Sequence, residues 1–111
     1  MYKLALIVNE VYKEGLKLAE ESGKEIDLEF FDPGQRIKDR DRVFLALSGA
    51  VEAAVKRAKK HISVKVRKTF ISVTDDGRVL PVSELEKISD EELGVTVRSR
   101  VGFGTEVTIR L

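Results

Sequence analysis

The sequence predicts an α/β two-layer sandwich, in which helices cover one face of a mixed five-stranded sheet. Two long segments, 4–22 and from about 40 to 60, repeat apolar residues at the helical period. Five shorter segments alternate apolar with polar residues, as strands with one wet face do. Because the outward positions of these strands are nearly all polar, we expect water on one face of the sheet and helices on the other.

The first half of the chain predicts a helix, a strand and a second helix. The helix at 4–22 contains Gly15, which in a helix costs about 1 kcal/mol relative to alanine. We therefore expect another element to cross this helix closely at Gly15. A strand follows at 26–30, and Asp39 or Asp41 is a suitable N-cap for the second helix.

The second half of the chain predicts four strands with a short helix between the second and the third. Strands at 62–66 and 71–75 form a hairpin with its turn at Lys68-Thr69, and Ser83 with Glu86 has the spacing of a capping box that begins the short helix. Ser89 and Glu92 repeat this spacing, which predicts one more helical turn. The last two strands are joined by a Gly-Phe-Gly loop and carry alternating apolar residues. These are Val95, Val97 and Val101 in the first strand, and Val107, Ile109 and Leu111 in the second.

Composition excludes several classes of protein. The 111 residues, with 42% hydrophobic and 35% charged residues, predict a single globular domain spanning 1–111. No apolar run is long enough to span a membrane, and the N-terminus lacks the features of a signal peptide, so we expect a cytoplasmic protein. There is no cysteine, and His61 is the only histidine, at the end of the second helix, so no metal site is expected.

Two further expectations come from charge. The net charge is +1, which implies no general attraction to nucleic acid. Asn9 and Gln35 are the only side-chain amides among many lysines and glutamates, a balance typical of thermophiles.

Asp75 is the most informative residue for function. It follows Ile71 and Val73 on the apolar face of its strand, and burial of an unpaired carboxylate is costly. One interpretation is that Asp75 caps the turn that Asp76 and Gly77 begin. The other is that its carboxylate is a functional group.

Cations crowd the end of the second helix, where Lys56 and Arg57 are followed by Lys59 and Lys60. They could bind a phosphate. The alternative is that they favour the negative end of the helix dipole and form a solvated face.

The chain from Leu4 to Leu111 resembles the ATP-binding domain of sensor histidine kinases, in the superfamily of gyrase, a heat-shock chaperone and mismatch-repair ATPases. Five stretches carry the resemblance in order along the chain. They are Asp39–Val43 at the start of the Asn-bearing helix, Ala53–Arg57 within it, Val73–Pro81 as the first glycine box, Ser83–Ile88 as the helix that follows, and Ser99–Leu111 as the closing hairpin. In the family the aspartate matched by Asp75 accepts a hydrogen bond from the adenine amino group, and Gly77 belongs to the same box.

The chain also departs from the family. Ala53 replaces the asparagine that holds Mg²⁺, Gly49 replaces the general-base glutamate of hydrolytic members, and Val79 replaces the second glycine of the box. The segment 82–93 is too short for the family's mobile lid, second glycine box and phosphate-binding helix. The resemblance thus implies a shortened ATPase-like domain whose residual nucleotide-site positions are Asp75, Gly77, Ala53, Lys56 and Arg57.

Three functions follow as hypotheses. The first is a degenerate, non-catalytic domain without cofactor or metal, which acts as a protein-interaction or regulatory module near two-component signalling. The second is a weak binder of ATP, ADP or adenine that uses Asp75, with Lys56 or Arg57 toward phosphate. The third, a phosphotransferase, is disfavoured because His61 lies in no phospho-acceptor motif, so we expect no enzyme. Because loss of the lid uncovers apolar surface, we expect a homodimer or a protein partner, and no specific nucleic acid or membrane.

Overall fold

The computed structural model describes residues 1–111 and contains seven strands and three helices. None of the helices combines the length and the apolar character that a membrane span requires. In chain order the elements are β1 (Tyr2–Lys3), α1 (Leu4–Glu21), β2 (Glu25–Phe30), β3 (Arg36–Ile37), α2 (Arg40–Arg57), β4 (His61–Val66), β5 (Phe70–Asp75), α3 (Val82–Ile88), β6 (Val95–Arg100) and β7 (Gly104–Arg110).

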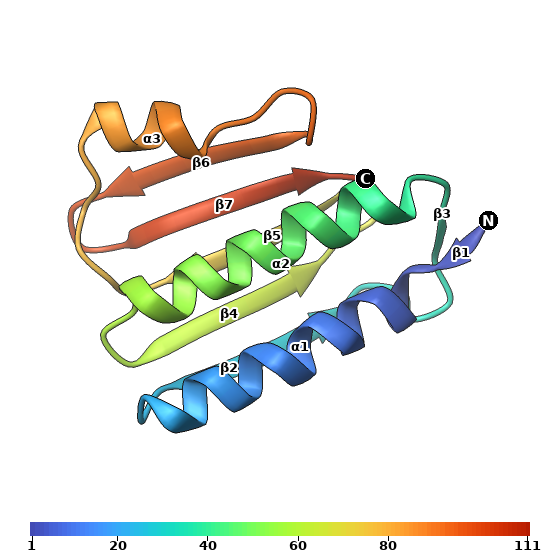
Figure 1. Cartoon of the computed structure of the whole chain (residues 1–111), viewed down its shortest axis with the longest axis horizontal. Helices are drawn as coiled ribbons and strands as arrows, with labels where there is room; N and C mark the ends of the chain where they lie inside the picture. The colour runs from blue at the N-terminus through green and yellow to red at the C-terminus, as the bar shows by residue number, and fades with distance from the viewer.

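Five of the strands form one mixed sheet in the order β2-β4-β5-β7-β6 (Figure 1). Only β2 and β4 are parallel, and α2 makes the crossover between them. The other three pairs are antiparallel, with Val73 of β5 opposite both Val64 of β4 and Val107 of β7. The predicted fold class, an α/β sandwich on a mixed five-stranded sheet, is confirmed.

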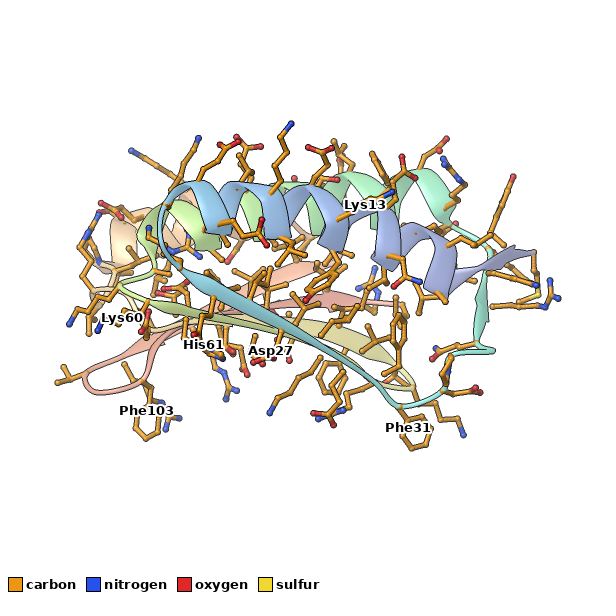
Figure 2. All side chains as sticks on the ribbon, turned by 90° about the horizontal axis from the view of Figure 1, so that it is seen from below. Lys13, Asp27, Phe31, Lys60, His61 and Phe103 are labelled. Atoms are coloured by element: carbon orange, nitrogen blue, oxygen red, sulfur yellow. The ribbon has the colours of Figure 1, made fainter.

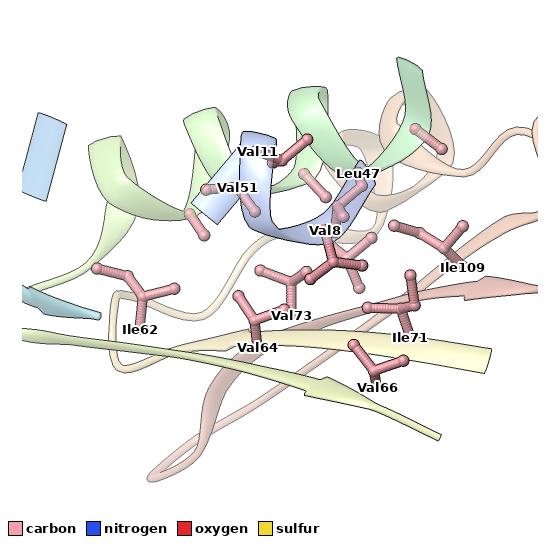
Figure 3. Packing of buried hydrophobic residues seen from close by; sticks show 14 of the residues in the cluster. Val8, Val11, Leu47, Val51, Ile62, Val64, Val66, Ile71, Val73 and Ile109 are labelled. Carbon is pink, nitrogen blue, oxygen red and sulfur yellow. The ribbon is translucent and has the colours of Figure 1, made fainter. Parts of the chain in front are cut away.

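The core lies between the sheet and the two long helices, which run side by side across it (Figures 1 and 3). The residues predicted to point inward from β4 and β5 are buried, and so is the whole apolar stripe of α2. Each buried aliphatic side chain contributes about 1.5–3 kcal/mol relative to its exposed state. The fully buried residues with the largest side chains include Leu4, Leu47, Ile62, Ile71 and Ile109.

The opposite face of the sheet carries polar side chains and no helix (Figure 2). Ion pairs lie on this face, including Arg98 of β6 with Glu106 of β7, and Glu29 of β2 with Arg67, just after β4, at 3.1 Å. His61 begins β4 and its Nε2 lies 2.7 Å from Asp27 Oδ2, so the expectation that His61 ends a helix was wrong. Exposed pairs of this kind are each worth about 0–1 kcal/mol, so the sheet depends on its buried face.

Several element ends differ from the prediction. Helix α2 ends at Arg57 instead of Lys60, because the chain turns there to enter β4. The two-residue strands β1 and β3 form a separate antiparallel pair that was not predicted, since two residues cannot show an alternating pattern. Val101 lies outside β6 in the hairpin loop and is 85% exposed, so its predicted inward position in a strand was wrong.

Of the predicted helix caps, the position of Asp39 is confirmed, but the expected cap hydrogen bonds are absent. Helix α3 has Pro81 at its N-cap position, and no side chain forms a cap hydrogen bond, so Ser83 and Glu86 form no capping box. Asp39 occupies the N-cap position of α2 without a cap hydrogen bond, and its carboxylate accepts instead from Arg42 Nε at 3.4 Å. In the turn before β6, the Leu93 N–H donates to Asp90 Oδ1 at 3.0 Å. Asp90, and not Ser89 as predicted, is therefore the side-chain acceptor that caps this turn.

The close crossing expected at Gly15 is confirmed, and it involves α2. A Cβ atom at Gly15 would lie 2.6 Å from Val51 Cγ1 and 3.3 Å from Ile26 Cδ1. Val51 is itself buried, so it has little room to move. The glycine therefore allows α1 to approach both α2 and the sheet.

We expect Gly15→Ala to destabilise the fold by about 1–3 kcal/mol, because overpacking against Val51 outweighs the gain in helix propensity. Urea denaturation followed by circular dichroism measures the change. Gly49→Ala is the matched control, since Gly49 lies in α2 with nothing within 4 Å of an added Cβ, and it should stabilise by up to about 1 kcal/mol. Equal effects of the two substitutions would contradict this account of the helix crossing.

Candidate functional site

Asp75 ends β5 on the face of the sheet that the helices cover. Its Cα is in register with Ile62 of β4 and with Thr105 of β7, and the residue is 3% exposed. The alternation that begins at Ile71 thus continues to Asp75, as predicted. The central position in the sheet leaves the carboxylate beside the C-terminal end of α2.

Both carboxylate oxygens of Asp75 have partners. The Gly77 N–H donates to Oδ1 at 2.9 Å, so the prediction that Asp75 caps the following turn is confirmed. Arg57 donates to Oδ2 through Nε at 3.2 Å and through Nη2 at 3.0 Å. The Arg57 side chain is only 13% exposed, which makes this a buried, charge-assisted pair. Arg57 lies in the last turn of α2, as the interpretation through the helix dipole requires, but its side chain is paired with Asp75 and is not part of a solvated face.

Gly77 is required here for its lack of a side chain. A Cβ atom at this position would lie 2.4 Å from the backbone oxygen of Arg57 and 2.8 Å from Asp75 Oδ1. The turn after β5 therefore passes directly against the last residue of α2. Gly77, Asp75 and Arg57 form a single cluster, although they come from two elements and a loop.

Asp76 holds the link between α2 and β4. Its Oδ1 accepts hydrogen bonds from the N–H groups of Lys59 at 2.8 Å and Lys60 at 3.1 Å. Desolvation would raise the pKa of Asp76, but N–H donors from Lys60, His61 and Lys59 outweigh it and lower the pKa below its usual value. The two lysines therefore bind the Asp76 side chain through their backbone N–H groups, beyond the end of α2.

Ala53 lies one helical turn before Arg57, and the two residues line the same narrow groove. The groove has a volume of about 160 Å³ and lies between α2, α3 and the turn that precedes β6. Its other walls are mostly apolar and include Leu45, Ile88 and Leu93. Pockets for small ligands usually have volumes of about 300–1,000 Å³, so this groove is smaller than a typical ligand pocket.

The groove offers few polar atoms for a metal or a phosphate. Ala53 presents a methyl group, whereas Mg²⁺ requires oxygen ligands. The segment between Pro81 and Gly94 folds as α3 and one turn, and no glycine-rich loop is present in it. The residues of this site therefore do not fit a magnesium-bound triphosphate.

Lys56 does not belong to the cluster. Its Nζ pairs with Glu52 Oε1 at 3.2 Å on the exposed surface of α2, and the Lys56 side chain is 75% exposed. For Lys56 the prediction of a solvated face is confirmed. The structure thus brings together Asp75, Gly77 and Arg57, places Ala53 in the adjoining groove, and leaves Lys56 apart.

The sequence did not reveal the pairing of Arg57 with Asp75. A signal was present, because Arg57 follows Ala53 by four residues and must share its helix face. The lining of the groove by Leu93 and Ile88 was also missed, since it depends on how α3 and the turn fold back onto α2.

Comparison with solved structures assigns the fold. The nucleotide-free catalytic domain of histidine kinase ThkA matches with a TM-score of 0.77 at 18% identity, over 99% of this chain and 92% of that chain. The histidine kinase AdeS of Acinetobacter baumannii matches with a TM-score of 0.75 at 15% identity, over 99% of this chain and 64% of AdeS. The cytoplasmic segment of histidine kinase QseC matches with a TM-score of 0.65 at 14% identity, over 93% and 69% of the two chains.

The chain therefore has the fold of histidine kinase catalytic, ATP-binding domains, as the resemblance implied. No protein-family model and no curated protein sequence matches this chain.

Proposed function

We propose that this chain is a non-catalytic domain with the histidine kinase ATPase fold, which acts as a protein-interaction or regulatory module linked to two-component signalling. The observation that carries the proposal is that the Asp75 carboxylate already forms hydrogen bonds within the protein. Its Oδ2 accepts two hydrogen bonds from Arg57, and its Oδ1 accepts one from Gly77. In the family the matching carboxylate accepts a hydrogen bond from adenine, whereas here the carboxylate of Asp75 accepts hydrogen bonds from Arg57 and Gly77.

The Asp75 carboxylate already accepts three hydrogen bonds, and an adenine amino group would compete with Arg57 for it. It would exchange a buried, charge-assisted pair for a neutral hydrogen bond with a net worth of about 1 kcal/mol. The displaced guanidinium would then need a new partner. Together with the methyl group of Ala53, this argues against use of the site by Mg-ATP.

The exposed apolar surface beside the site supports a protein partner. Leu45 lines the groove next to Ala53 and is 61% exposed, and Val82 at the start of α3 is 68% exposed. Side chains of this kind gain free energy when another protein covers them. The partner in this proposal is a second copy of the chain or a different protein, and its setting is the cytoplasm.

A weak adenine-nucleotide domain is the second candidate. It is favoured by the retention of Asp75 and by the groove beside Ala53 and Arg57. If Arg57 turned outward, it would release Asp75 for adenine and offer its charge to a phosphate.

The nucleotide test separates the two candidates. We expect no shift of the melting midpoint with 1 mM ATP or ADP, with or without Mg²⁺. A ligand with a dissociation constant near 10 μM would stabilise by about 2.7 kcal/mol at that concentration, which corresponds to on the order of 10 °C for a domain of this size. Differential scanning fluorimetry measures the midpoint.

Two variants refine this test. Ala53→Asn should remain unresponsive to Mg-ATP, because a triphosphate still lacks a glycine-rich loop of N–H donors. Arg57→Ala frees the carboxylate of Asp75, so a nucleotide response in this variant alone would identify Arg57 as the only obstacle. A reproducible shift of several degrees in the wild-type protein would overturn the proposal in favour of the second candidate.

A further inference from the structure

A second groove lies on the outer surface of the helical layer, away from the cluster at Asp75. It follows the line where α1 and α2 cross at Gly15, and its volume is about 250 Å³. Leu18 of α1 and Phe44 of α2 contribute apolar walls, and both are partly exposed. Because α1 and α2 run side by side (Figure 1), residues of both helices form the base of the groove.

Carboxylates surround this groove. Glu10 and Glu14 of α1 and Glu52 of α2 all line it, and no lysine or arginine does. Glu10 and Glu14 form no ion pair in the structure, and Glu52 shares only an exposed pair with Lys56. The neighbouring lysines of α1, Lys13 and Lys17, do not line the groove.

This arrangement leaves like charges close together. Glu10 and Glu14 are four residues apart on one helix, a spacing at which two like charges destabilise the helix. Glu52 adds a third negative charge from the facing helix. A cationic partner would relieve this repulsion, whereas an anionic partner would increase it.

We propose that the groove between α1 and α2 is a docking site for a basic amphipathic helix of a partner protein. One or two aliphatic side chains of the helix enter between Leu18 and Phe44, and its lysines or arginines face Glu10, Glu14 and Glu52. This is recognition of a helix in a groove, in which apolar residues supply affinity and flanking charges supply specificity. The inference rests on the proposed function as an interaction module, and it names the surface and the chemistry of the partner.

A synthetic peptide provides the test. The probe is a helix of about 18 residues, long enough to fold in water, with leucine at every third or fourth position and lysine on both flanks. A second peptide carries glutamate in place of each lysine. NMR chemical shifts of the whole chain should change along the facing sides of α1 and α2 with the lysine peptide and not with the glutamate peptide. Added salt should weaken the binding.

Charge reversal on the protein completes the test. Glu10→Lys with Glu14→Lys should weaken binding of the lysine peptide by about tenfold or more, because two attractive contacts become repulsive. The matched control is Glu20→Lys with Glu21→Lys, which changes the net charge equally on exposed positions of α1 outside the groove. Circular dichroism confirms that both variants remain folded.

Three results would overturn the inference: no binding of the lysine peptide, equal binding of the two peptides, or equal losses in the groove variant and its control. A natural partner whose footprint lies on the α2–α3 groove would also overturn it and would leave the proposed function standing. A nucleotide response of the wild-type protein would do the opposite, since it tests the function and not this surface.

Discussion

Replacement of Asp75 by alanine should lower the free energy of unfolding by about 3–5 kcal/mol, the range observed when one partner of a buried ion pair is removed. The substitution leaves the guanidinium of Arg57, only 13% exposed, without its carboxylate. It also removes the acceptor of the Gly77 N–H. At about 4 °C per kcal/mol, the melting midpoint should fall by more than about 10 °C.

Two further variants separate the contributions. Asp75→Asn retains an oxygen that can accept a hydrogen bond from Gly77 but loses the charge. The free energy of unfolding of this variant should therefore lie between those of the wild type and Asp75→Ala. Arg57→Met combined with Asp75→Leu removes both charges, and apolar replacement of a buried pair is often neutral. The double variant should therefore be more stable than Asp75→Ala. An unchanged midpoint for Asp75→Ala would exclude the structural role and would make a ligand the reason for this carboxylate.

Gly104→Ala should cost about 3 kcal/mol or more, since it combines backbone strain with overpacking. Gly104 has φ = +80°, in the left-handed region that an alanine adopts only with strain. An added Cβ would lie 2.0 Å from the backbone oxygen of Asp75 and 3.1 Å from the Cα of Asp76. These contacts are with backbone atoms, which cannot move without displacement of the turn after β5.

Gly102→Ala, in the loop directly before β7, is the matched control. Its φ of +85° is as unfavourable for alanine, but no atom lies within 4 Å of an added Cβ. Its cost should be about 1–2 kcal/mol, from backbone strain alone. Urea denaturation of the two variants measures the difference, and equal losses of stability would refute the close contact at Gly104.

The fold could be predicted because its main elements have strong periodic patterns. The stripe of α2 and the alternation at 62–66 and 71–75 each repeat often enough to define a buried face, and these faces are buried as expected. Caps and short strands could not be predicted in the same way. The Ser83–Glu86 spacing is compatible with a capping box, but the turn at Pro81 leaves Ser83 inside α3.

The site was predicted only in part. Asp75 could be recognised because a carboxylate on an apolar face requires a partner, and the turn cap to Gly77 follows from local sequence. Its second partner, Arg57, comes from another element, 18 residues earlier in the chain, so the pairing depends on how α2 packs on the sheet. The need for glycine at position 104 is likewise a contact between segments, with the backbone of Asp75.

The single parallel pairing in the sheet has a consequence for how the molecule folds and opens. Strands β4 to β7 pair through antiparallel contacts, two of them local hairpins, whereas β2 reaches β4 only after the crossover through α2. Loop closure must precede such long-range pairing, so β2 and α1 should join the sheet last and separate from it first. Amide hydrogens of β2 should then exchange with solvent faster than those of β5. A partner that binds across α1 and α2 would slow this exchange, so the edge of the sheet would report on events at the helical surface.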